Sequence, residues 1–249
     1  MLFSLVNQIN NSINQLNPEK EAPAFLNQVS INRPDFIEEL QQAAPNPDVF
    51  KLTAVTIAKA VLFYIQQIPA MADTLVSVVK NPSVHPAIRC AVTGILVYLV
   101  QPHDLIPDNS PGGYGFLDDN AIIRAGIVEY LQVSSGSGRT FEDEIKHIQA
   151  LTKLVPLHIV PLLQATINSM SMSIQLLQLL PPDMIEMTTQ QLIQNPLAAP
   201  AIQQPQGFSA MPGPNIGDGH WSGGTYFEGN NVIMPGGPSL IDGELFIPY

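Results

Sequence analysis

The chain has 249 residues, of which 45% are hydrophobic and only 12% charged, with one cysteine and a formal net charge of −11. This hydrophobic content is enough for a sizeable core and argues against a chain that is disordered throughout. The acidic balance excludes a protein that holds nucleic acid through phosphate contacts, because such binding needs clustered cations. The single Cys90 excludes an internal disulfide and any metal site built from several cysteines.

Residues 1–47 are predicted to form an N-terminal amphipathic helix and a proline-containing connector. Apolar residues recur at helical spacing from Leu2 to Leu16, with Asn and Gln between them. This helix packs on its own domain or docks on a partner or a membrane surface, but it has no cation before Lys20, whereas membrane-surface helices usually carry Lys or Arg. The N-terminus lacks the basic region and cleavage site of a secretory signal, so a cytoplasmic location is the default expectation.

Residues 48–194 are predicted to form an α-helical domain. Asp48 and Asp118 are suited to cap two of its helices, and prolines mark most of the breaks. The uncharged stretch 154–182 contains too many polar groups for a membrane span, which favours a buried hairpin or an interface helix. In chain order, helices are expected at 35–43 within the connector and then at 49–68, 70–80, 86–100, 118–133, about 140–154, 157–180 and 183–194.

Residues 195–249 are predicted to be an extended tail rich in Gly and Pro. No Lys or Arg follows Lys153, so the C-terminal part of the chain has no electrostatic means of holding anionic lipid. Short runs of β-forming residues between turn signals suggest segments that are ordered on a partner or on this chain, against the alternative of a disordered tail. The candidate partner-binding residues are the aromatic side chains Trp221, Tyr226, Phe227, Phe246 and Tyr249.

The segment 87–131 consists of an apolar helix, the turn DLIPD, a Gly-rich loop, the string LDD and a second apolar helix. Pro102 and residues 104–108 form the first half of this motif, and residues 117–119 form the second. This segment resembles the YkvA-like family, a domain of unknown function, and the remainder of the chain lies outside the resemblance. The loop 109–116 is more polar and richer in glycine than the family's loop. The resemblance implies a helix–loop–helix corner and carries no established chemistry.

Four carboxylates, those of Asp104, Asp108, Asp118 and Asp119, lie within sixteen positions of this motif. If they converge, they are hard oxygen ligands suited to Mg²⁺, Ca²⁺ or Mn²⁺, and His103 could add a nitrogen. Converging carboxylates repel one another unless a cation joins them. That cation is a metal ion or an arginine, and the two candidates are Arg89 and Arg124 on the flanking helices. The alternative to a metal site is a structural corner, in which the aspartates cap helices and the loop and an arginine bridges them.

The fold expected from these patterns is all-α: a multi-helix domain built around the helix–loop–helix corner, with an amphipathic helix before it and an extended tail after it. No catalytic signature is present, which favours a non-enzymatic interaction or scaffold protein that assembles with itself or with a protein partner through its apolar helices and tail. One alternative is a hydrolase-like enzyme that depends on a divalent cation at the aspartates. A second alternative is a protein that associates peripherally with a membrane surface.

Overall fold

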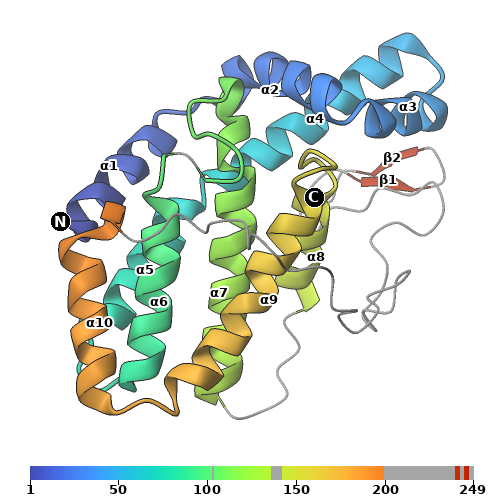
Figure 1. Cartoon of the computed structure of the whole chain (residues 1–249). Helices are drawn as coiled ribbons and strands as arrows, with labels where there is room; N and C mark the ends of the chain where they lie inside the picture. The colour runs from blue at the N-terminus through green and yellow to red at the C-terminus, as the bar shows by residue number, and fades with distance from the viewer. Residues whose placement is uncertain (103, 136–141, 199–238, 242–243, 247–249) are drawn as a thin grey trace.

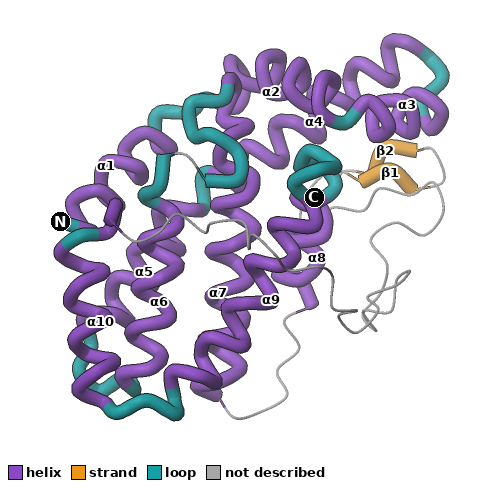
Figure 2. Tube along the Cα trace, viewed as in Figure 1, coloured by secondary structure: helices purple, strands orange, loops and turns teal. Residues whose placement is uncertain are grey.

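The computed structural model describes residues 1–102, 104–135, 142–198, 239–241 and 244–246. In this part of the chain the fold is all-α, as expected, apart from a short hairpin near the C-terminus (Figure 2). The helices are α1 (Leu2–Asn14), α2 (Pro18–Asn32), α3 (Pro34–Ala43), α4 (Pro47–Ile65), α5 (Ile68–Lys80), α6 (Pro86–Leu99), α7 (Leu117–Ser135), α8 (Glu142–Thr152), α9 (Val160–Leu177) and α10 (Pro182–Gln194), with 3-10 helices η1 (Pro111–Phe116) and η2 (Pro196–Ala198).

The helices α5, α6, α7 and α10 lie side by side, α9 crosses in front of α7, and α2, α3 and α4 lie across one end (Figure 1). Apolar side chains from α1 through α9 form one buried cluster. The cluster includes residues on both sides of position 47, where the sequence suggested the start of a separate domain. The helix α6 lies in the middle of this arrangement and contacts α5, α7, α9 and α10. Its apolar sequence therefore reflects burial on several sides rather than an amphipathic surface helix.

The N-terminal helix α1 packs on this chain, which was one of the two expectations for it. Leu2, Val6 and Ile13 are fully buried, and the helix contacts α5 and α6. Those apolar positions are therefore covered within the protein. In the part of the chain that the structure describes, no helix combines the length and the apolar character needed to cross a membrane.

The prediction of an irregular connector directly after α1 is wrong for residues 18–32, because they form the helix α2. Pro18 occupies the first helical position, where a missing N–H costs nothing, and the side chain of Asn17 accepts a hydrogen bond from the Glu19 N–H at 3.0 Å. Pro23 lies inside the helix, and Phe25 is buried against the rest of the protein. Prolines that suggested an irregular segment are thus accommodated within a helix.

The helix α4 begins one residue before the predicted cap, so the prediction for Asp48 is also wrong. Asn46 is the capping residue, and its side-chain oxygen accepts hydrogen bonds from the N–H groups of Asp48 and Val49. Residues 136–141 and the tail residues 199–238, 242–243 and 247–249 lie outside the described residues. On either side of the gap at 242–243, β1 (Ser239–Ile241) and β2 (Glu244–Phe246) pair antiparallel.

Candidate metal centre

The four aspartates of the sequence motif lie where the chain passes from α6 to α7. Asp104 and Asp108 belong to the loop after α6, whereas Asp118 and Asp119 belong to the first turn of α7. Because α7 begins at Leu117, Asp118 is not the N-cap that the sequence suggested, and its side chain is completely buried. Asp119 is 1% exposed, so this helix start places two adjacent carboxyl groups in the interior.

The loop and the helix start bring three of these carboxyl groups together. Asp104, Asp108 and Asp119 each offer an oxygen atom, and the three atoms lie within 4.8 Å of one another. Asp118 lies beside this triad, and its Oδ2 accepts a hydrogen bond from the Tyr98 hydroxyl at 2.6 Å. The same oxygen accepts a second, longer bond from a backbone N–H of the loop, that of Ile106 at 3.3 Å.

Tyr98 is a site residue that the motif analysis did not include. It lies in the last turn of α6, and both its ring and its hydroxyl are buried. The available signal was a residue with a polar tip in a mostly apolar helix, six positions before Asp104. A buried tyrosine hydroxyl usually has a hydrogen-bond partner, and here the partner is Asp118.

Six carboxylate oxygens of the cluster are buried and have no hydrogen-bond partner among the described residues. They are both oxygens of Asp104, both of Asp119, and the Oδ1 atoms of Asp108 and Asp118. Buried polar groups in folded proteins are nearly always paired, and an unpaired buried charge is far more costly than an unpaired neutral group. In the part of the chain that the structure describes, no cation is therefore paired with these oxygens.

The electrostatic consequence is that these carboxyl groups hold their protons more tightly than usual. Burial, followed by the charges of Asp118 and Asp108, raises the pKa of Asp104 from 3.8 to about 9. Burial and the charge of Asp118 raise the pKa of Asp108 to about 7. Burial also raises the pKa of Asp118 to about 6, against the lowering effect of the Tyr98 hydrogen bond. For Asp119, burial and the charges of the other three raise the pKa well above its usual value.

Neither predicted bridging arginine interacts with the aspartates in the part of the chain that the structure describes. Arg89 pairs with Glu186 of α10 at 2.7 Å. The expectation that either arginine joins the cluster is therefore wrong, because each lies on a face of its helix that meets a different neighbour. The contacts of Arg124 are with Asn120, Glu144 and Gln67.

The loop between the two pairs of aspartates is held tightly against the protein. Gly112 and Gly113 adopt positive φ angles of 68° and 75°, and a Cβ on Gly112 would collide with the backbone of Phe25 in α2. A Cβ on Gly115 would come within 2.7 Å of the Asp108 Cα, so the loop passes directly over that aspartate. Glycine is required at these places by conformation or by close approach.

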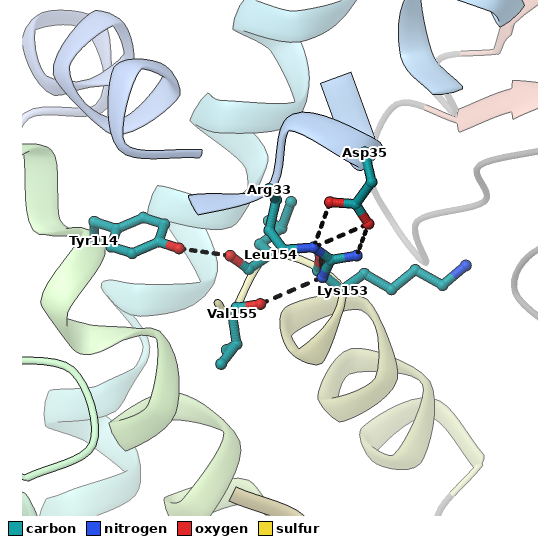
Figure 3. Close-up of polar contacts among 6 residues, drawn as sticks. All are labelled: Arg33, Asp35, Tyr114, Lys153, Leu154 and Val155. Atoms are coloured by element: carbon teal, nitrogen blue, oxygen red, sulfur yellow. Dashed lines mark hydrogen bonds and ion pairs between the residues drawn. The ribbon is translucent and has the colours of Figure 1, made fainter. Parts of the chain in front are cut away.

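Tyr114 anchors the outer side of this loop, as Figure 3 shows. Its hydroxyl donates a hydrogen bond to the Leu154 carbonyl at 2.7 Å, and its ring lies 5.6 Å from that of Phe25. Arg33, from the junction of α2 and α3, donates hydrogen bonds to the neighbouring carbonyls of Lys153 and Val155 (Figure 3). The loop between Asp108 and Asp118 is thus held in place by segments far from it in the sequence.

The remaining predicted site residues lie mostly outside the described residues. His103 is one of them, as are the tail aromatics Trp221, Tyr226, Phe227 and Tyr249. Phe246 is the last residue of β2, where its backbone pairs with Ser239. The structure thus assembles the aspartates and leaves the expected partner-binding set as a prediction.

Residues 88–124 match the model of a family described as a protein of unknown function, DUF1232. This match confirms the resemblance to a domain of unknown function over a short segment. No curated protein and no solved structure matches the chain. The matched segment contains all four aspartates, Tyr98 and both arginines. The chain is therefore an all-α protein with a DUF1232-like segment, and its candidate metal centre lies within that segment.

Proposed function

We propose that this protein binds one divalent cation through Asp104, Asp108 and Asp119, with Asp118 beside them. The observation that supports this most directly is the set of buried carboxylate oxygens without partners. A divalent cation would satisfy these oxygens and cancel their mutual repulsion. Oxygen donors of this kind suit Mg²⁺, Ca²⁺ and Mn²⁺.

The role that we assign to the ion is structural rather than catalytic. It would join the loop after α6 to the first turn of α7, whose carboxylates repel one another when they are ionised. Asp118 and Asp119 are fully buried, and Asp118 is already held by Tyr98 and by the loop backbone. Such a site fits a non-enzymatic protein whose helical corner is stabilised by an ion.

The experiment is thermal unfolding and calorimetric titration of the full chain, treated with chelator and then given Mg²⁺, Ca²⁺, Mn²⁺ or Zn²⁺. An ion that binds only the folded state adds about 2.7 kcal/mol at ~100 times its dissociation constant. For a chain of this size, that gain raises the melting temperature by about 5–11 °C. Asp119→Asn should remove the response, while the control Asp183→Asn, at an exposed site in the first turn of α10, should keep it. The absence of any shift or binding heat with all four ions would refute the proposal.

A second candidate function is self-assembly, and it is favoured by an exposed apolar strip on the end of α9, the turn after it and the first half of α10. The strip comprises six side chains that are 43% to 80% exposed: Met172, Leu176, Leu179, Leu180, Met184 and Met187. Met172 and Leu176 share one face of α9 at a spacing of four residues, and Met184 and Met187 share one face of α10 at a spacing of three. Asp183 and Glu186 are the only acidic residues between Leu154 and Gln194, and that interval has no Lys or Arg.

The occupant that we propose for this strip is a second copy of the chain. Two copies that each carry a net charge of −11 repel each other in most orientations. A face with few charges can nevertheless meet the same face of a second copy. Sedimentation velocity of the full chain over a range of concentrations should show a dimer. Leu179→Gln should weaken it, whereas the control Leu52→Gln, at a similarly exposed residue on α4, should not. A monomer at all concentrations would refute self-assembly, and flotation with zwitterionic vesicles would then indicate a lipid surface instead.

A further inference from the structure

The donor set of the aspartate site limits which dication it suits. Asp104, Asp108 and Asp119 each offer an oxygen to the same place, and Asp118 lies beside them with its Oδ2 already bonded to Tyr98 and Ile106. Ca²⁺ takes six to eight oxygen ligands, whereas Mg²⁺ usually binds through one or two carboxylates and keeps several waters. Six oxygens of these four carboxyl groups are buried, although Asp104 and Asp108 are half-buried as whole side chains, so the site offers several protein oxygens to one ion.

The size of the site can be bounded from its oxygen atoms. Because the three oxygens of Asp104, Asp108 and Asp119 lie within 4.8 Å of one another, a point exists that is at most about 2.8 Å from each, which is that separation divided by the square root of three. Metal–oxygen distances are roughly 2.3–2.6 Å for Ca²⁺ and roughly 2.0–2.1 Å for Mg²⁺. Binding of Ca²⁺ thus requires an inward shift of no more than about 0.5 Å, and binding of Mg²⁺ up to about 0.8 Å.

The surrounding structure resists contraction of the site. Asp119 belongs to the first turn of α7, and its neighbour Asp118 is fixed by the bond from Tyr98. The turn at Asp108 lies directly under Gly115, which leaves no space on that side. Contraction would therefore have to move the helix or the loop. Mg²⁺ demands near-ideal octahedral geometry, while Ca²⁺ accepts irregular geometry.

From these observations we infer that the ion of this site is Ca²⁺ in preference to Mg²⁺ and Mn²⁺. This inference rests on the proposed function, since it requires that a dication binds at the aspartates. It extends that proposal by assigning the site to the larger hard cation, held almost entirely by protein oxygens.

The experiment is isothermal titration of the full, chelator-treated chain with Ca²⁺, Mg²⁺ and Mn²⁺ in one buffer. Ca²⁺ should bind at least tenfold more tightly than either other ion. The luminescent ion Tb³⁺ serves as a second probe, because the Tyr98 hydroxyl lies 2.6 Å from Asp118 and its ring can sensitise a bound lanthanide. Ca²⁺ should displace Tb³⁺ at lower concentration than Mg²⁺. Tyr98→Phe should weaken the sensitised emission, and Tyr130→Phe, at the far end of α7, should leave it unchanged.

The outcomes separate this inference from the proposed function. Tighter binding of Ca²⁺, lost in Asp119→Asn, supports both. Binding of Mg²⁺ or Mn²⁺ as tight as that of Ca²⁺ overturns the inference and leaves the cation-binding function standing. Binding that persists in Asp119→Asn, or the absence of binding by every ion, overturns both.

Discussion

Replacing Asp104 by Asn should stabilise the cation-free protein, although it removes a side chain from the candidate site. Both oxygens of Asp104 are buried without a partner among the described residues, and the pKa of this carboxyl is raised to about 9. Near pH 7.5 the group is therefore protonated in the folded protein and ionised in the unfolded chain. An amide of similar shape has no proton to take up, so it avoids this cost.

The size of this stabilisation follows from the difference in protonation of Asp104 between the folded and the unfolded protein. The Asp104 carboxyl takes up a proton when the chain folds, and its pKa in the unfolded chain is 3.8. At about pH 7.5 this protonation lowers the free energy of unfolding by at most about 5 kcal/mol, at 1.36 kcal/mol per pH unit. The amide is itself polar and equally buried, which reduces the gain. We therefore expect Asp104→Asn to raise the free energy of unfolding by about 2–5 kcal/mol, and the melting temperature by about 4 °C or more.

The assay is urea unfolding of the wild-type and Asp104→Asn chains in chelator, followed by the same measurement with saturating Ca²⁺. The order of stability should reverse when the ion is added, because only the wild type gains from binding. A variant that is less stable than the wild type in chelator would refute the reasoning, since it would show that Asp104 already has a favourable partner in the folded state.

Three further predictions concern the same region. In chelator, the free energy of unfolding of the wild type should fall as pH rises from about 5 to 9. The reason is that folded carboxyls with pKa values near 6, 7 and 9 keep protons that the unfolded chain releases near 3.8. A rise in stability with pH, measured by urea unfolding, would contradict this. Tyr98→Phe should cost about 1.5–3 kcal/mol by the same assay, since it removes a buried hydrogen bond to a charged group, and no loss would show that the bond is weak. Gly112→Ala should cost more than about 2 kcal/mol, because its φ is positive and its Cβ would collide with the Phe25 backbone. The matched Gly94→Ala, in open space on α6, should instead gain about 0.5–1 kcal/mol, and similar effects at the two glycines in thermal unfolding would be inconsistent with this packing.

Much of the helical architecture could be predicted from the sequence, because apolar periodicity and prolines mark the helices from α4 onward. The helix α2 could not, since Pro18 and Pro23 suggest an irregular segment unless the first is recognised as a helix start. The burial of Phe25 under the loop after α6 depends on contacts between distant segments, which no local pattern displays.

The spacing of the aspartates allows their convergence without requiring it, and it does not indicate which charges surround them. A sequence shows that Arg89 and Arg124 are near the motif, yet it does not show which way each helix face points. Arg89 faces α10 and Arg124 faces α8, so both are taken up by glutamates there. The role of Asp118 depends on where α7 begins. Because the helix begins at Leu117, one residue before Asp118, this side chain points inward and does not cap the helix.

The matched segment 88–124 contains every aspartate of the site, but it does not contain what covers them. The loop inside it is covered by Phe25 of α2 and is tied by Tyr114 to the Leu154 carbonyl, and both partners lie outside the segment. The segment therefore contains the candidate ligands but not the residues that hold them in position. Grafted into another helical protein, it would need a substitute for α2 and an acceptor for the Tyr114 hydroxyl before its aspartates could be held in the same arrangement.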